Sequence, residues 1–265
     1  LYSMGIRFPR KRYNVFMGST SIKEWLFALK IWFFRERIDD ENIIKEYEQD
    51  FANHSGVSHG VSFGSGRMSL FAILEALKIG PGDEVIMPGF TCVVVPNALI
   101  YKGITPIYVD ISRKDFNIDV EKIESSISAR TKAIYAQHTF GVPCDIGKIR
   151  ILANKYKLKI IEDCAHALGG DIAGSMVGSS SDVAFFSTDH SKIISTYLGG
   201  MATTNNNDIA DQLRKIQISS PFLPRKDVFK IIRSFLFEWI YFSPYVLWIG
   251  LLVHKGLIKF NILYS

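Results

Sequence analysis

The sequence predicts an α/β fold with a mostly parallel sheet and helices on both faces. From about residue 59 to 205, short apolar strands alternate with helical stretches of about ten residues. The chain has 265 residues, 48% of them hydrophobic and 22% charged, which suits one large domain or one domain plus part of a second. Right-handed crossovers between parallel strands would then place an active site along one edge of the sheet.

Each expected strand is a short apolar run, and each expected helix has apolar residues at helical spacing. The expected strands are Gly60–Phe63, Glu84–Met87, Thr105–Val109, Ala133–Ala136, Lys159–Ile161 and Val183–Phe186. The expected helices between them are Met68–Leu77, Cys92–Tyr101, Val120–Ile127 and Ile146–Tyr156. An acidic helical pattern from Asp39 to Asn53 precedes the first strand.

Three segments follow from the changes in composition along the chain. Residues 1–38 form a basic and aromatic N-terminal segment, and residues 39–217 form the predicted large domain. Residues 218–265 form an apolar helical segment, expected to lead into a truncated C-terminal domain. The chain begins with Leu1 rather than Met and shows no signal-peptide pattern, so we expect a fragment of a longer reading frame.

The longest uncharged run, Trp239–Val253, is 15 residues long and contains Pro244. A membrane-spanning helix needs about 20 apolar residues, so this run is not expected to span. The nearby basic residues would suit weak contact with a membrane surface; they are Lys230, Arg233, Lys255 and Lys259. Packing of these helices on the core or on a partner subunit is the favoured interpretation.

Charge and cysteine content narrow the class of protein. The formal charge is +5, and the chain has no dense basic block or stripe of interleaved aromatic and basic residues, which argues against nucleic-acid binding. Three widely spaced cysteines, Cys92, Cys144 and Cys164, form no CxxC pair. Neither a disulfide framework nor a metal site is therefore expected, and a reducing cytoplasm is the expected location.

The first candidate for chemistry is a glycine-containing turn from Phe63 to Ser69, between a strand and a helix. Glycine lets backbone N–H groups at a helix start approach an anion, and the helix dipole favours negative charge there. Many such turns bind nothing. The turn is neither a Walker loop nor a full GxGxxG, which argues against a nucleotidase or a dinucleotide-dependent oxidoreductase.

The second candidate is Glu162-Asp163 at the end of an apolar strand, followed by His166. A carboxylate at this position can hold a buried cation, such as a protonated ring nitrogen, through a charge-assisted hydrogen bond. Taken alone, Asp163 could equally cap a short helix, and His166 could be a structural histidine.

The third candidate is Lys192, in a polar loop between a strand that ends at Ser187 and a second one that begins at Gly199-Gly200. An ammonium group is costly to bury without partners, and a lysine with a depressed pKa can form a Schiff base with a carbonyl. A surface lysine is the alternative. In order, the three candidates supply an anion cradle, an acid for a pyridinium nitrogen, and an imine lysine, which is the set that pyridoxal 5′-phosphate (PLP) requires.

The chain from about Gly60 to Gln217 resembles the DegT/DnrJ-type sugar-nucleotide aminotransferases, which are fold type I PLP enzymes. The matching stretches are Gly64–Leu70, Gly82–Pro88, Thr131–Ile134, Glu162–Gly169 and Ser187–Gly200. By this resemblance Lys192 carries the cofactor and moves protons, Asp163 pairs with the pyridine nitrogen, and His166 lies near the ring. The phosphate would be held by Gly66, Arg67 and Ser187.

The resemblance also implies a function and an assembly. Members of this family transfer an amino group, usually from glutamate, to a nucleotide-linked keto-sugar, in surface-polysaccharide or secondary-metabolite pathways. We therefore expect a PLP-dependent aminotransferase that acts as a homodimer. The alternatives are a sugar dehydratase or deoxygenase on the same fold, and a PLP-binding regulatory protein without turnover. Some dehydratase relatives have histidine in place of the imine lysine, so Lys192 favours transamination.

The chain departs from the family pattern at several positions. Arg67-Met68 replaces the common Thr-Ala, and Arg67 could either strengthen the anion site or point to solvent. Cys92 stands where an aromatic residue commonly stacks on the cofactor ring, which makes Phe90 a candidate substitute. The loop Thr188–Ser191 also differs from the family, so the identity of the substrate cannot be transferred.

Overall fold

The computed structural model describes residues 20–34, 40–241, 253 and 256–257. The chain divides into two compact units. The larger unit comprises residues 40–221 and holds the sheet, and the smaller one draws on residues 1–39 and 222–265. This smaller unit joins two parts of the chain that the sequence analysis treated as separate segments, residues 1–38 and 218–265.

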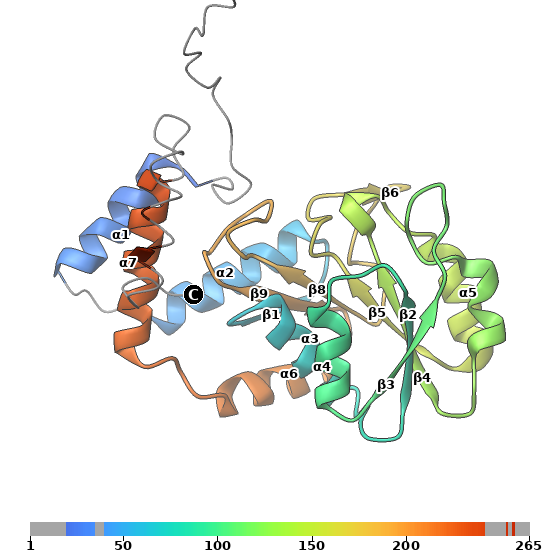
Figure 1. Cartoon of the computed structure of the whole chain (residues 1–265). Helices are drawn as coiled ribbons and strands as arrows, with labels where there is room; N and C mark the ends of the chain where they lie inside the picture. The colour runs from blue at the N-terminus through green and yellow to red at the C-terminus, as the bar shows by residue number, and fades with distance from the viewer. Residues whose placement is uncertain (1–19, 35–39, 242–252, 254–255, 258–265) are drawn as a thin grey trace, which may run out of the picture. The chain divides into compact units, whose positions relative to one another are not determined.

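The larger unit contains a seven-stranded sheet with the order β1-β9-β8-β5-β4-β2-β3 (Figure 1). The strands are β1 (His59–Phe63), β2 (Glu84–Pro88), β3 (Thr105–Val109), β4 (Thr131–Gln137), β5 (Lys159–Asp163), β8 (Val183–Ser187) and β9 (Gly200–Thr204). All neighbouring pairs are parallel except those of β9, which runs antiparallel to both β1 and β8. A small hairpin of β6 (Asp171–Ile172) and β7 (Ser175–Met176) lies outside this sheet. The predicted fold class is confirmed.

Helices cover both faces of this sheet, because alternate strand residues are buried in opposite directions. Val85 and Met87 of β2 belong to one core with α3, α4 and α6, whereas Ile86 faces a second core with α5. A third cluster packs Phe51 of α2 against Phe186 of β8. The helices of this unit are α2 (Glu41–His54), α3 (Gly66–Ala76), α4 (Val94–Tyr101), α5 (Ile146–Tyr156) and α6 (Asn207–Ser219).

The parallel strands place their carboxyl ends along one edge of the sheet. The register pairs Gln137, the last residue of β4, with Asp163, the last residue of β5, and pairs Asp163 with Phe185 of β8. Ser187 ends β8, and the turn after β1 leads directly into α3. Because ligands of such sheets bind at the carboxyl edge, the candidate residues lie where the fold favours a site.

The sequence-based interpretation of Val120–Ile127 as a helix was wrong. This segment forms two short 3₁₀ turns, η2 (Val120–Lys122) and η3 (Glu124–Ser126). The hydroxyls of Ser125 and Ser126 both donate to the Lys122 carbonyl, at 3.1 and 3.3 Å. Serine side chains compete in this way with helical backbone bonds, and they shorten the helix that the apolar spacing predicts.

The smaller unit pairs helix α1 (Ile22–Phe34) with α7 (Arg225–Tyr241). The Trp25 indole N–H of α1 donates to the Leu236 carbonyl of α7 at 3.0 Å, and the Trp25 and Trp239 rings lie 5.6 Å apart. Among the described residues, neither these helices nor those of the larger unit are long and apolar enough to cross a membrane. Most of the uncharged run Trp239–Val253 lies outside the described residues.

Candidate active site

The N-terminus of α3 forms an anion cradle at the carboxyl edge of the sheet. Ser65 caps the helix, since its hydroxyl accepts the Met68 N–H at 3.1 Å and its carbonyl accepts the Ser69 N–H at 3.0 Å. The N–H groups of Gly66 and Arg67, in the first turn, have no acceptor within the helix. They remain directed toward the space beyond the helix end, where the dipole favours an anion.

Close packing brings this helix end against β8 and β9. A Cβ built on Gly66 would lie 3.0 Å from the Ser187 Cβ, and a Cβ on Gly200 would overlap Gly66 N and Ser65. Glycine at both positions therefore lets Ser187 reach the helix N-terminus. The structure brings together Gly66, Arg67 and Ser187, the three residues predicted to hold a phosphate, and the Arg67 side chain is exposed.

Replacing Gly200 with alanine is expected to damage this cradle. The new methyl group would overlap the backbone of Ser65 and Gly66, which cannot move without shifting α3, so the free energy of unfolding should fall by about 1–3 kcal/mol. Urea unfolding measures the loss. Gly64→Ala is the matched control, because a Cβ there meets nothing within 4 Å. Equal stability of the two variants would contradict the close packing.

Asp163 is a buried carboxyl group held by two donors. It is 8% exposed at the end of β5, and Tyr135 of β4 donates its hydroxyl to Oδ2. The Ala165 N–H donates to Oδ1 at 2.9 Å. Burial raises the pKa of the Asp163 carboxyl, against the opposing effect of these two hydrogen bonds. A protonated ring nitrogen would relieve the cost of burying this charge.

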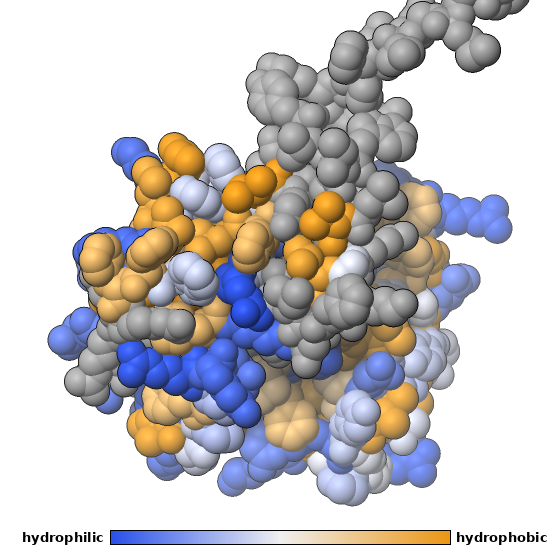
Figure 2. Space-filling model, turned by 60° about the vertical axis from the view of Figure 1, so that its left-hand side comes forward, coloured by the Kyte–Doolittle hydropathy of each residue, from blue (hydrophilic) through white to orange (hydrophobic). Residues whose placement is uncertain are grey.

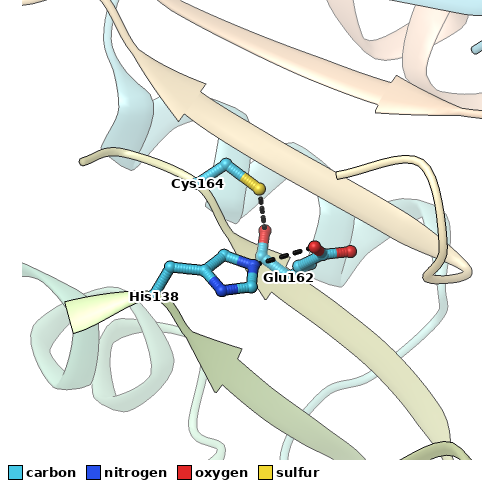
Figure 3. Close-up of side chains that lie close together, drawn as sticks. All are labelled: His138, Glu162 and Cys164. Carbon is cyan, nitrogen blue, oxygen red and sulfur yellow. Dashed lines mark hydrogen bonds and ion pairs between the residues drawn. The ribbon is translucent and has the colours of Figure 1, made fainter. Parts of the chain in front are cut away.

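His138 and Glu162 form a buried pair next to the end of β5 (Figure 3). His138, just after β4, accepts the Cys144 N–H on Nδ1 at 3.1 Å, so its proton lies on Nε2. Nε2 lies 2.8 Å from Glu162 Oε1, which also accepts the Gly178 N–H at 2.8 Å. The backbone N–H of His138 donates to the backbone carbonyl of Asp163 at 3.1 Å. This pair therefore ties β4 to β5 next to the candidate acid.

His138, Glu162 and Cys164 lie close enough to resemble a metal site, with their ligand atoms within 4.8 Å of one another. Hydrogen bonds already use both nitrogens of His138 and one oxygen of Glu162. Burial raises the pKa of the Cys164 thiol well above its usual value, whereas a metal ligand must be a thiolate. The geometry of this cluster is that of a hydrogen-bonded support for β5.

Lys192 and His166 meet at the same edge of the sheet. Lys192 lies in the loop between β8 and β9, and its N–H donates to the Asp189 carbonyl at 3.0 Å. Partial burial lowers the pKa of His166, and the nearby positive charge of Lys192 lowers it further, whereas Asp163 acts in the opposite direction. The charges of Lys192 and Asp163 therefore both act on His166.

Replacing Lys192 with methionine is expected to raise the pKa of His166. The change removes a positive charge and keeps an unbranched side chain of similar length, so the protonated imidazole becomes less unfavourable. NMR titration of the ring protons measures the shift. In the parent chain, stability should fall as the pH drops below the ordinary histidine pKa of 6.5, since the unfolded chain takes up the proton first. An unchanged pKa in the variant would show that Lys192 does not face His166.

Phe90 belongs to a row of aromatic side chains near this edge. Its ring lies 6.2 Å from that of Phe116 and 5.9 Å from that of Phe140, which in turn stacks parallel to His166 at 6.4 Å. Phe90 is 45% exposed, so its ring is accessible to a ligand. Cys92, at the position where relatives commonly have an aromatic residue, is exposed.

Sequence reasoning missed the residues that support the site. Gln137 donates to the Phe90 carbonyl at 3.2 Å and to the Thr139 hydroxyl at 2.9 Å, and Asn117 accepts the Thr139 N–H at 2.8 Å. Tyr135 donates its hydroxyl to the Asp163 carboxylate, and the backbone N–H of His138 donates to the Asp163 backbone carbonyl. Only the position of Gln137 and His138 just at the end of an expected strand could have indicated them.

Comparison of the sequence with known protein families gives a match. A sequence model of the DegT/DnrJ/EryC1/StrS aminotransferase family matches residues 35–225. The chain belongs to this family. Its cofactor is PLP, as expected from the sequence. The glycine-lined helix end beside Ser187 and the buried carboxyl of Asp163 fit the phosphate and the ring nitrogen of this group.

Individual relatives are sugar aminotransferases. The GDP-perosamine synthase of Caulobacter vibrioides is 42% identical over 174 residues, which cover 66% of this chain and 47% of the relative. The UDP-N-acetyl-3-dehydro-α-D-glucosamine 3-aminotransferase of Acidithiobacillus ferrooxidans is 40% identical over 186 residues, 68% of this chain and 50% of the relative. The present chain thus spans about half the length of these relatives.

A solved structure supports the same assignment of the fold. The aminotransferase from Psychrobacter cryohalolentis superimposes with a TM-score of 0.70 at 31% sequence identity. The match covers 74% of this chain and 50% of that structure. The expected fold type I architecture of the large domain is therefore confirmed.

Proposed function

We propose that the protein is a PLP-dependent aminotransferase that moves an amino group, supplied by glutamate, to a nucleotide-linked keto-sugar. One observation carries this proposal. The carboxyl edge of the sheet gathers a glycine-lined helix N-terminus, a buried carboxyl group, a histidine and the loop that carries Lys192. Relatives named as sugar aminotransferases support the type of substrate.

The proposed roles follow from the chemistry of each side chain. PLP, when bound, supplies an electron sink for the carbon that loses or gains the amino group. Asp163 keeps the pyridine nitrogen protonated, and the N–H groups of Gly66 and Arg67 hold the phosphate together with the Ser187 hydroxyl. Lys192 anchors the cofactor covalently and carries a proton on Nζ.

His166 and Phe90 complete the proposed site around the cofactor ring. The lowered pKa keeps His166 neutral near pH 7, so its imidazole can accept or donate a hydrogen bond beside the ring without adding charge next to Lys192. Phe90 offers an accessible aromatic face in place of the residue that Cys92 replaces. The exposed row of Phe90, Phe116 and Phe140 supports the assignment of an apolar wall to this edge.

The amino-donor half of the reaction tests this function in the intact protein. With PLP and glutamate, we expect 2-oxoglutarate to form in an amount equal to the protein, and a nucleotide-linked keto-sugar to restore repeated turnover. With α-deuterated glutamate, the formation of 2-oxoglutarate should be slower when removal of the α-proton is rate-limiting. Protein that binds PLP but releases no 2-oxo acid from glutamate or glutamine would contradict the proposal and favour the regulatory alternative.

We also propose that the working unit is a homodimer, as the family resemblance implies. Phe140 is 68% exposed and Phe116 is 49% exposed beside the site, and a second chain that covered these rings would bury them. Light scattering of the intact protein should give twice the mass of one chain. A fully active monomer would refute this assembly.

A further inference from the structure

Helix α1 is mostly hydrophobic, yet many of its side chains are exposed. All but three of its 13 residues are apolar, and none of them is buried. Phe27 is 59% exposed, and Phe33 and Phe34 are 71% and 73% exposed. Exposed aromatic side chains in such a helix are normally covered by protein or lipid, so the exposed part of α1 is a candidate contact surface.

Helix α7 adds positive charge next to these aromatic side chains. Basic residues of its first turns line an open pocket of about 790 Å³ together with Trp32 of α1. The basic residues are Arg225, Lys226, Lys230 and Arg233. The pocket also contains Asp227 and Phe229, and the Arg225 guanidinium lies 5.6 Å from the Phe229 ring. Figure 2 brings this side of the molecule forward and shows hydrophobic surface next to hydrophilic surface.

The charge of the whole sequence follows the same division. Residues 1–39 and 222–265 contain 14 of the 31 basic side chains and only 5 of the 26 acidic ones, a formal charge of +9. Residues 40–221 carry −4 by the same count. The excess of +5 in the chain therefore comes entirely from the segments that form the smaller unit. A modest total charge hides this asymmetry when the sequence is taken as a whole.

We propose that the smaller unit binds the surface of a membrane that contains anionic phospholipids. The exposed aromatic side chains of α1 would enter the headgroup region, and the basic side chains of α7 would contact lipid phosphates. Both helices would lie in the plane of the interface. At about 1.5 Å per residue, the 13 residues of α1 and the 17 residues of α7 are shorter than the ~30 Å hydrocarbon core.

Charge complementarity favours a membrane over a second copy of the chain. A symmetric contact between two smaller units would bring together two sets of segments that each carry a formal charge of +9, and like charges in an interface oppose association. An anionic bilayer instead attracts the basic side chains and accepts tryptophan and phenylalanine at its interface. This surface lies in a different unit from the candidate active site, so the inference stands independently of the proposed reaction.

Vesicle flotation of the intact protein tests the inference. We expect the protein to float with vesicles of phosphatidylglycerol and phosphatidylcholine, and to stay in solution with phosphatidylcholine alone. Lys226→Gln combined with Lys230→Gln should lower binding by about fivefold for each lost charge. The matched control, Lys45→Gln with Lys215→Gln, removes two lysines from exposed positions on α2 and α6 and should float like the parent.

A second pair of variants tests the apolar contribution. Phe33→Ser with Phe34→Ser should abolish flotation at 0.15 M salt, whereas Ile151→Ser with Ile218→Ser, at 70% and 76% exposure in the larger unit, should not change it. Thermal unfolding confirms that every variant is folded. Failure to float with anionic vesicles would overturn the inference. An equal loss of flotation in the variants of the smaller and the larger unit would also overturn it. The same holds for a stable dimer, formed through the smaller unit, that does not bind vesicles.

Discussion

Lys192→Ala is expected to abolish transamination in the intact protein while leaving the fold unchanged. The side chain lies in a loop at the carboxyl edge, so its loss removes no buried apolar contact of the sheet. A positioned group that transfers protons contributes roughly 10²–10⁴-fold to a rate, and the lost covalent anchor adds to that loss. Turnover with glutamate and a keto-sugar acceptor measures the effect, and circular dichroism checks the fold.

Lys132→Ala is the matched control for this experiment. Lys132 is an exposed lysine near the amino end of β4, at the edge of the sheet opposite to the candidate site. Its removal costs only a long contact of 3.9 Å with Asp83, and turnover should stay close to that of the parent. Substantial transamination in Lys192→Ala would contradict the assigned role, whatever the control shows.

Asp163→Asn should retain PLP but lose most of the catalytic rate. Asparagine keeps the shape of the side chain and can still accept the Ala165 N–H, but it cannot hold a proton on the pyridine nitrogen by charge. A charge-assisted hydrogen bond is worth roughly 1.5–3 kcal/mol. The rate should therefore fall by about tenfold to more than a hundredfold. The absorbance of the bound cofactor should also depend on pH differently in the variant.

Asp182→Asn separates this effect from a general loss of carboxylate hydrogen bonds. Asp182 accepts the Ile160 N–H at 2.9 Å and contacts Lys159 at 2.9 Å, just before β8 at the opposite edge of the sheet. This variant should lose some stability and keep the rate and the cofactor absorbance of the parent. Near-normal turnover in Asp163→Asn would count against its role as the partner of the ring nitrogen.

Most of the sheet could be predicted because its strands are locally encoded. The six expected strands are short, largely apolar runs. The structure reproduces Thr105–Val109 unchanged and extends each of the other five by one to three residues. The segment Val120–Ile127 was predicted as a helix because its apolar residues have helical spacing, but it forms two short 3₁₀ turns. The hydroxyls of Ser125 and Ser126 both donate to the Lys122 carbonyl and compete with helical backbone bonds. The spacing of apolar residues gives no sign of such hydrogen bonds.

The candidate site could be predicted only in part, for a similar reason. Gly66, Asp163 and Lys192 each end or follow a strand, so their positions in the sequence place them at one edge. Tyr135 and His138 act on Asp163 from the neighbouring strand, a contact that depends on the order of strands in the sheet. In the sheet, β5 lies between β4 and β8. The local sequence pattern of a strand does not indicate which strands lie beside it.

The most direct test of the account is to locate the cofactor on the chain. Protein incubated with PLP is reduced with borohydride, digested, and mapped by mass spectrometry. A single pyridoxyl group on the peptide that contains Lys192, absent from Lys192→Ala and present in Lys132→Ala, is the result that the account requires. A label on another lysine, or no label on protein that binds PLP, would contradict it.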